Sequence, residues 1–352
     1  MSANNTKLGI VYHKDYLIHT QGHHPERKER LEHITSALEN RGISEKLTMI
    51  DPVPASVDDI ALVHDSGYIK TIEEACNSGQ RNLDMDTYIV PESYRVALLS
   101  AGGVLTGLRG VMGIGPDIVF ALNRPPGHHA ERSRAMGFCL FNNVAVAAEV
   151  AKRDYGLKRI AIVDWDVHHG NGTQHTFSTE KEVLFFSVHQ SPAFPGTGSN
   201  RETGRDQGEG YTINVPLPAG CGDEDYMAVF DEILLPVLHE FQPELILLSA
   251  GQDAYHRDPL AGMNLTGRGY YQMAQKLADI ADEYAAGRLL ACLEGGYHLD
   301  GQAGAVLQAM NAFGKWNLPI PHESAGNYDG EMAGRRIREV KEMHQKFWTS
   351  LQ

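Results

Sequence analysis

The sequence predicts an α/β fold class, a single-domain, three-layer structure with a mainly parallel central sheet and helices on both faces. Short apolar runs rich in β-branched residues alternate along the 352 residues with longer segments of helical period. Glycine and proline are scattered between these runs, so neither a linker nor an internal repeat divides the chain. One large core is the simplest interpretation.

Seven strands and seven helices account for the pattern. The strands are expected at 8–12, 118–122, 159–163, 183–188, 211–215, 245–248 and 289–293. The helices are expected at 25–40, 57–78, 92–112, 142–154, 223–241, 269–286 and 331–350. Such alternation is typical of a parallel sheet that is covered on both faces.

Composition narrows the class of protein. A formal net charge of -14 argues against a nucleic-acid groove. The four cysteines are far apart and form no Cys-x-x-Cys pair, which favours reduced thiols in a cytoplasmic protein. Neither a signal-type segment nor an apolar run of about 20 residues is visible, so no membrane contact is expected. Homo-oligomerisation is left open.

The most informative segment, Asp164–Gln174, directly follows the apolar run 160–163. In Asp-x-Asp-x-His, alternate side chains of an extended backbone point to the same side, so Asp166 and His168 should lie together. Buried carboxylates and imidazoles are costly unless they are paired or bound to a cation. The segment therefore predicts a metal site.

Three more polar clusters follow predicted strands: Arg124–Ala130, Ser249–Asp253 and Glu294–Tyr297. Each alone has an ordinary explanation, such as an N-cap aspartate, a surface His-His pair or a Gly-Gly turn. Ligands of open α/β sheets bind at the carboxyl ends of strands. Four clusters at four strand ends therefore favour one shared site.

These blocks resemble the signature segments of the zinc-dependent histone deacetylase superfamily, with further similar blocks at 137–143 and 194–198. The resemblance runs from about Gly9 to about Leu299, followed by a C-terminal helical extension at about 314–352. Asn171 and the block 293–297 are more similar to class II members and bacterial deacetylase-like amidohydrolases. The resemblance implies the arginase-deacetylase fold for a single catalytic domain spanning 1–352.

The resemblance also implies one Zn²⁺ per chain, with Asp166, His168 and Asp253 as its ligands. One nitrogen and two oxygen ligands leave a position open for water and the substrate carbonyl. The implied activity is removal of acetyl or other acyl groups from N-acylated lysine-type amines by metal-activated water.

Catalytic roles follow from the same resemblance. His129 would act as general base and then as general acid, while His128 would act electrostatically and be oriented by Asp164. Asn171 would face His129, and the Tyr297 hydroxyl would donate to the oxyanion.

Substrate contacts are implied at the channel. Phe138 and Phe194, beside Gly137, match aromatic residues that line a narrow acyl-lysine channel, although two core phenylalanines would look the same in sequence. Leu260 is expected at the mouth and Asp86 as a rim carboxylate.

Structural K⁺ sites are implied as well. The residues that match the first site are Asp164, Asp166, His168, Ser187 and Val188, and those that match a second are Phe177 and Val183. These sites bind largely through backbone oxygens, which constrain side-chain identity little.

Three alternatives remain open at this level. An acetylpolyamine amidohydrolase shares the machinery, but Leu260 stands where one such branch has glutamate, and a loop near Glu92 could supply a carboxylate instead. A non-catalytic acyl-lysine-binding module would not need His128, His129 and Tyr297. A two-manganese ureohydrolase would show Asp-Ala-His-x-Asp where this chain has 165–169.

Overall fold

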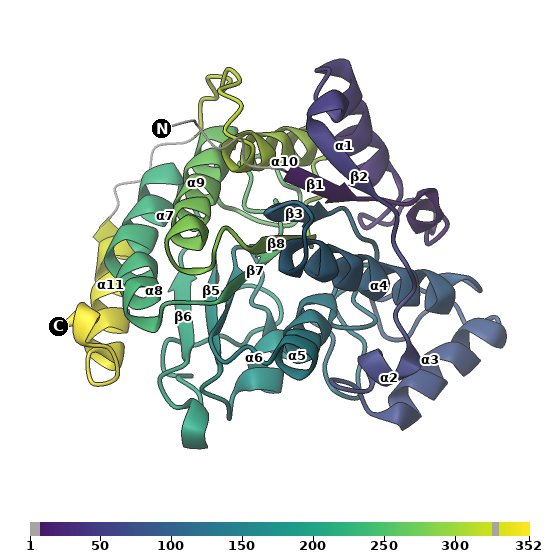
Figure 1. Cartoon of the computed structure of the whole chain (residues 1–352), viewed down its shortest axis with the longest axis horizontal. Coiled ribbons are helices and arrows are strands. Elements are labelled where there is room, and N and C mark those ends of the chain that lie inside the picture. Colours follow the sequence, from purple (N-terminus) through teal and green to yellow (C-terminus); the bar gives the residue numbers. More distant parts are fainter. Residues whose placement is uncertain (1–7, 326–330) are drawn as a thin grey trace.

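The computed structural model describes residues 8–325 and 331–352, which form one layered domain around a central sheet (Figure 1). The described strands are β1 (Leu8–Val11), β2 (Leu47–Ile50), β3 (Ile118–Ala121), β4 (Ile160–Asp164), β5 (Val183–Gln190), β6 (Thr212–Leu217), β7 (Leu245–Ala250) and β8 (Leu289–Leu293). Their order across the sheet is β2-β1-β3-β8-β7-β4-β5-β6. Every neighbouring pair is parallel, which confirms the predicted fold class.

Alternate residues of each strand enter two separate cores. In β4, Ala161 and Val163 belong to one apolar cluster, whereas Ile160 and Ile162 belong to the other. Side chains alternate across a strand with a period of two, so both faces of these strands are buried. This burial explains why the strand sequences are apolar at every position.

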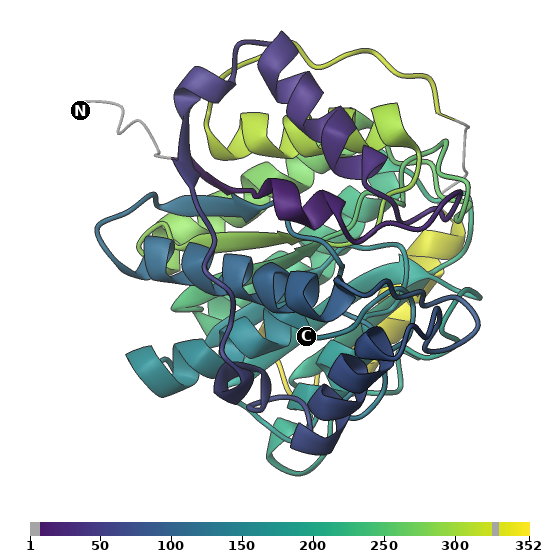
Figure 2. The ribbon, with the colours of Figure 1, turned by 90° about the vertical axis from the view of Figure 1, so that its right-hand side faces the viewer.

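Helices cover both faces of the sheet (Figures 1 and 2). One layer contains α1 (Glu29–Asn40), α7 (Asp223–Val229), α8 (Leu235–Phe241), α9 (Gly267–Tyr284) and α10 (Leu299–Phe313). The opposite layer contains α2 (Val57–Ile60), α3 (Ser66–Asn77), α4 (Ser93–Met112), α5 (Asn143–Tyr155) and α6 (Asn171–Phe177). A π-helical segment, Phe230–Leu234, joins α7 to α8, so the predicted helix at 223–241 is continuous.

Several elements differ from the prediction. The helix expected at 57–78 is divided into α2 and α3, because Asp65 lies in an extended conformation at the N-cap of α3 and its backbone N–H donates to Arg132. Strand β2 was not predicted, and neither were α6 and α10. Each strand that was predicted is present within a few residues of its expected ends.

The C-terminal extension is helical only in part among the described residues. Residues 314–325 form no helix, whereas α11 (Glu331–His344) and a 3₁₀ turn (Thr349–Leu351) follow. Helix α11 packs against β6, and Val340, Trp348 and Leu351 are buried in the same core as β6. The indole of Trp348 donates to the Gly210 carbonyl at 2.9 Å. None of the described helices has the length and hydropathy required to cross a bilayer.

Candidate metal and active site

The four strands that carry polar clusters are neighbours in the middle of the sheet. Strands β3, β8, β7 and β4 are adjacent in that order, and each cluster follows the carboxyl end of its strand. Parallel strands end at the same edge, so the clusters meet there. The structure thus brings together the residues that the sequence placed at one site.

Asp166, His168 and Asp253 form a triad that could hold a metal ion. Nδ1 of His168 lies 3.2 Å from a carboxylate oxygen of Asp166 and 3.2 Å from one of Asp253. One ligand atom from each residue lies within 4.8 Å of the other two. Among residues 8–325 and 331–352, this is the one group of three or more such side chains, so the two-metal ureohydrolase alternative finds no second ligand set there.

Glycines make room for the two carboxylates. A Cβ at Gly251 would lie 2.0 Å from Asp166, and a Cβ at Gly295 would lie 2.1 Å from Asp253. Backbone N–H groups then hold the carboxylates, with Gly295 donating to Asp166 at 2.8 Å and Val167 donating to Asp253 at 2.9 Å. Main-chain N–H groups therefore orient the two carboxylates of the triad.

The charge of the triad favours a cation. Asp166 and Asp253 are fully buried, and burial together with the charge of Asp166 raises the pKa of Asp253. Burial lowers the pKa of His168, but the two carboxylates outweigh burial and raise it to about 10. A site that holds a proton this firmly has negative charge to neutralise, which a divalent metal can do by displacing that proton.

His128 and His129 are adjacent in sequence and form a histidine dyad. The two side chains differ in charge. Burial lowers the pKa of His128, but Asp166 and Asp164 raise it to about 10, and its Nδ1 lies 3.0 Å from Asp164. Burial, followed by the positive charges of His128 and His168, lowers the pKa of His129 well below its usual range. Neighbouring groups whose pKa values are pushed apart suit opposite roles, so His129 is the neutral imidazole that can accept a proton.

A pocket of about 240 Å³, which we call the channel, is lined in part by both histidines. Its lining consists of Asp86, Pro126, His128, His129, Gly137, Phe138, His168, Phe194, Leu260, Gly295 and Tyr297. The Phe194 ring lies edge-on to His129, with 5.0 Å between centroids, and the Phe138 ring lies edge-on to Tyr297 at 5.7 Å. Apolar walls around a polar base suit an extended alkyl chain that ends in a polar group.

An unusual backbone conformation forms one wall of the channel. Gly137 and Phe138 both have positive φ, at 56° and 70°, which is rare for an aromatic residue. A Cβ at position 137 would lie 2.4 Å from the His129 ring, so only glycine fits there. The hydrogen bond from the Phe138 backbone N–H to the Thr87 hydroxyl, at 3.2 Å, helps to maintain this conformation, in which the Phe138 ring lines the channel.

The remaining sequence-predicted residues fall in two places. Leu260 (42% exposed) and Asp86 line the channel, whereas Glu92 lies at the exposed N-cap of α4 and is not among the residues that line the channel.

The residues expected at the K⁺ sites lie on and beside β5. Ser187 pairs in register with Asp164 across β4 and β5, and Val188 follows it. Phe177 ends α6 and Val183 begins β5, both buried.

Sequence reasoning missed residues that hold the site from behind. Glu294 accepts the backbone N–H groups of Gly127 and His128 at 2.7 and 3.2 Å, and burial raises its pKa to about 7. Glu26 binds the Arg124 guanidinium through both oxygens, at 2.5 and 2.7 Å. Arg124 and Glu294 belong to the polar clusters at 124–130 and 294–297. Glu26 precedes a helix, and its sequence surroundings give no sign of this role.

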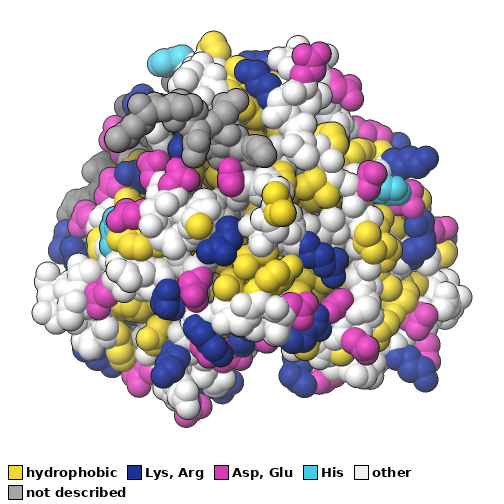
Figure 3. All heavy atoms as spheres, in the orientation of Figure 1, with side chains coloured by type: hydrophobic (Ala, Val, Ile, Leu, Met, Phe, Trp, Pro, Cys, Tyr) yellow, Lys and Arg dark blue, Asp and Glu magenta, His cyan; other side chains and the backbone are white. Residues whose placement is uncertain are grey.

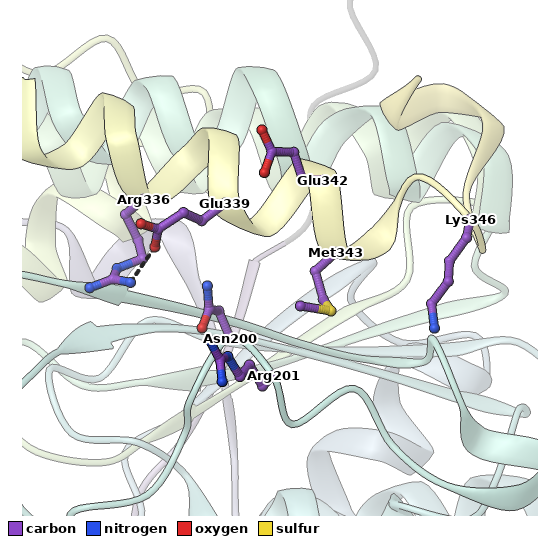
Figure 4. Close-up of a pocket in the computed structure, with 7 residues that line it drawn as sticks. All are labelled: Asn200, Arg201, Arg336, Glu339, Glu342, Met343 and Lys346. Atoms are coloured by element: carbon purple, nitrogen blue, oxygen red, sulfur yellow. Dashed lines mark hydrogen bonds and ion pairs between the residues drawn. The ribbon is translucent and has the colours of Figure 1, made fainter.

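A larger hollow, about 780 Å³, lies on the surface between α11 and the loop at Asn200 and Arg201 (Figure 4). Its charges are mixed and partly paired: Arg336 binds Glu339, and Lys346 lies 3.5 Å from Glu209. On the face of the molecule in Figure 3, basic and acidic side chains are interspersed with apolar ones. Neither this hollow nor this surface brings potential metal ligands together as the triad does.

The comparisons with known proteins agree with this geometry. Residues 24–313 match the family model described as histone deacetylase domain. The chain belongs to the histone deacetylase family. It is 41% identical to a probable deacetylase of Archaeoglobus fulgidus, over 97% of this chain and 98% of that protein.

Two further relatives extend the comparison. A histone deacetylase-like amidohydrolase of Pseudomonas aeruginosa is 41% identical over 78% of this chain and 71% of its own length. A solved structure of the HDA15 HD domain superposes with a TM-score of 0.90 at 34% identity, covering 98% of this chain and 97% of that one. The histone deacetylase family member described here therefore has the arginase-deacetylase fold and is a hydrolase of the deacetylase and amidohydrolase type.

Proposed function

We propose that this enzyme is a zinc-dependent amidohydrolase that removes acetyl or other acyl groups from N-acylated lysine-type amines. The observation that carries the proposal is the triad Asp166, His168 and Asp253, whose His168 lines the same channel as the neutral His129 and the aromatic side chains. An alkyl-amine chain fits the channel, and the amide would reach the polar base.

The donor set fits zinc. Two carboxylate oxygens and one imidazole nitrogen are ligands typical of an open catalytic site, and His168 lines the pocket through which water and substrate would reach the metal. Zinc bound there would polarise the scissile carbonyl and make water a stronger nucleophile. K⁺ ions bound near Asp164, Ser187 and Val188, and near Phe177 and Val183, would serve structure.

His129 is the proposed general base. Its low pKa leaves the ring neutral, so it takes the proton of the attacking water and then delivers it to the leaving amine. His128 stays protonated between Asp164 and Asp166 and stabilises negative charge next to the reacting carbonyl.

Tyr297 is the proposed oxyanion donor. Burial raises the pKa of its phenol well above the usual range, so the hydroxyl keeps its proton and can donate it in a hydrogen bond. A preorganised donor of this kind contributes roughly 2.7–4 kcal/mol to transition-state stabilisation.

The mouth of the channel bears on substrate choice. Leu260 offers an apolar surface that cannot offset the desolvation of a distal ammonium, which favours acyl-lysine over acetylpolyamines. Asp86, which also lines the channel, supports the second candidate, an acetylpolyamine amidohydrolase, because its carboxylate could pair with a cationic nitrogen. We place the enzyme in the cytoplasm.

Metal analysis and substrate comparison test the proposal together. We expect about one zinc per chain by elemental analysis, loss of hydrolysis on chelation and recovery on adding Zn²⁺. In parallel, kcat/KM is measured on an acetyl-lysine peptide, acetylspermidine and longer acyl amides, with acetyl-lysine expected to be the best substrate. Full activity in metal-free protein would overturn the zinc assignment, and preference for acetylspermidine would favour the second candidate.

A further inference from the structure

Asn171 lies between His129, the proposed general base, and the carboxylate of Glu131. Its Oδ1 is 2.8 Å from Nδ1 of His129, and its Nδ2 donates to Oε1 of Glu131 at 2.5 Å. Nδ2 also donates to the main-chain carbonyl of His129 at 3.2 Å. The two acceptors that face Nδ2 therefore fix which way round the amide sits.

The orientation of this amide decides where the His129 proton lies. An amide oxygen only accepts, so Nδ1 of His129 must carry hydrogen and Nε2 keeps the free lone pair that a base needs. A flipped amide would offer N–H to Nδ1 and impose the opposite tautomer. It would also turn Oδ1 toward the Glu131 carboxylate, which has no hydrogen to donate.

Glu131 is itself held in place on several sides. His175 on α6 lies 2.7 and 2.8 Å from the two carboxylate oxygens. The Glu131 carbonyl is bound by His64 at 2.9 Å, and its backbone N–H donates to Arg134 at 2.9 Å. Burial raises the pKa of Glu131, but the hydrogen bonds from His175 and Asn171 outweigh burial and keep it below the usual range.

We propose that Glu131 is a positioning residue of the reaction, which orients the Asn171 amide and through it sets the tautomer of His129. The inference rests on the proposed role of His129 as general base. It also explains why an amide suits position 171: aspartate there would bring two carboxylates to hydrogen-bond distance, where both cannot stay ionised.

Four variants test the inference: Glu131→Gln, Glu131→Ala, Asn171→Asp and the double variant Asn171→Asp with Glu131→Gln. Glutamine still offers an oxygen to Asn171, so Glu131→Gln should stay near the wild-type rate. Glu131→Ala should lower kcat about tenfold with KM nearly unchanged, as expected for loss of one charge-assisted hydrogen bond. Asn171→Asp should lower kcat more than Glu131→Ala, and the added Glu131→Gln change should restore most of that loss by removing the second charge.

The readouts separate positioning from a folding defect. Kinetics on an acetyl-lysine peptide are accompanied by thermal unfolding and zinc content, which should match wild type in Glu131→Gln and in the double variant. Wild-type kcat in Glu131→Ala, or a double variant no faster than Asn171→Asp, would overturn the positioning role. His129→Ala is measured alongside: if it retained activity, the proposed function itself would be wrong, whereas an inactive His129→Ala beside a fully active Glu131→Ala would remove Glu131 alone.

Discussion

The guanidinium of Arg30 donates through Nε to the main-chain carbonyl of Gly296 at 2.7 Å, across 266 residues of sequence. A second Arg30 nitrogen donates to the Glu294 carbonyl, and the guanidinium lies 5.0 Å from the centre of the Tyr297 ring. Asp258 accepts the Tyr297 backbone N–H at 2.6 Å. The backbone on both sides of Tyr297 and its ring are thus held in place by Arg30 and Asp258, which suits the proposed role of a preorganised oxyanion donor.

Replacing Tyr297 by phenylalanine should abolish most turnover. The change removes only the hydroxyl, so we expect kcat to fall about 10²–10³-fold with little change in KM. Steady-state kinetics on an acetyl-lysine peptide measure this effect. Metal content and unfolding temperature should match wild type, and a variant as fast as wild type would exclude Tyr297 from the mechanism.

A carboxylate at the channel mouth should shift substrate preference. Leu260 is 42% exposed and its backbone N–H is fixed by Asp258 at 3.0 Å, so Leu260→Glu can reach solvent without a buried charge. One partly exposed ion pair is worth up to about 1 kcal/mol, so kcat/KM for acetylspermidine relative to an acetyl-lysine peptide should rise about fivefold. The control is Leu260→Gln, whose side chain has the shape of the glutamate in Leu260→Glu but no charge. It should leave the ratio near wild type. An equal shift in both variants would contradict an electrostatic cause.

Alanine at position 137 should damage catalysis through packing. Gly137 and Gly156 both have positive φ, 56° and 68°, so alanine at either costs roughly 1–2 kcal/mol of strain. Only at Gly137 would the new Cβ meet another side chain, the His129 ring at 2.4 Å, whereas nothing lies within 4 Å at Gly156. We therefore expect Gly137→Ala to lower kcat at least tenfold and Gly156→Ala to lower stability alone. Equal kinetics in the two variants would show that the channel wall adapts.

Stability should depend on pH through Glu26. This buried carboxylate binds Arg124 at 2.5 Å and Arg30 at 3.1 Å; burial raises its pKa, but the guanidinium groups outweigh burial and hold it well below the usual range. The folded-state pKa lies below the unfolded value of about 4.3, so the stabilisation is present above that pH and is lost as pH falls below it.

Glu26→Gln gives the matching measurement. The variant leaves two buried guanidinium groups without their carboxylate, which should lower the free energy of unfolding by about 3–5 kcal/mol at pH 7. The deficit should shrink as pH falls below about 4.3, because Glu26 then takes up a proton in the unfolded wild-type chain while it stays ionised in the folded one, so folding becomes less favourable. Denaturant titrations of wild type and Glu26→Gln, at pH 7 and at a pH below about 4.3, measure the deficit in unfolding free energy. A deficit that is constant with pH would assign the stabilisation to packing.

Local pattern was enough to predict the strands that carry the site. The runs at 118–122, 160–163, 245–248 and 289–293 are apolar throughout because both faces of these central strands are buried. Strand β2 escaped prediction because it is a sheet edge with partly exposed residues, so its sequence lacks that signal. The triad could be placed because its members follow strands that end at one edge.

Other features depend on contacts that sequence spacing does not encode. Helix α10 is rich in glycine and alanine and is buried on nearly every side, so it shows no amphipathic period. Helix α6 begins inside the metal-site motif, whose polar residues hid a short helix. The contact of Asn171 with Glu131 joins residues 40 positions apart and required the folded backbone.

The match to the family model ends at residue 313, yet the fold does not. Ile337, Val340, Trp348 and Leu351 fill the apolar layer beside β6, and Arg336 donates to the Pro216 carbonyl on that strand at 2.9 Å. A chain shortened to the matched segment would expose this apolar layer beside the outermost strand, and an exposed apolar patch favours association with another molecule. Helix α11 and the residues after it, which lie outside the matched segment, thus keep the apolar side chains beside β6 away from solvent.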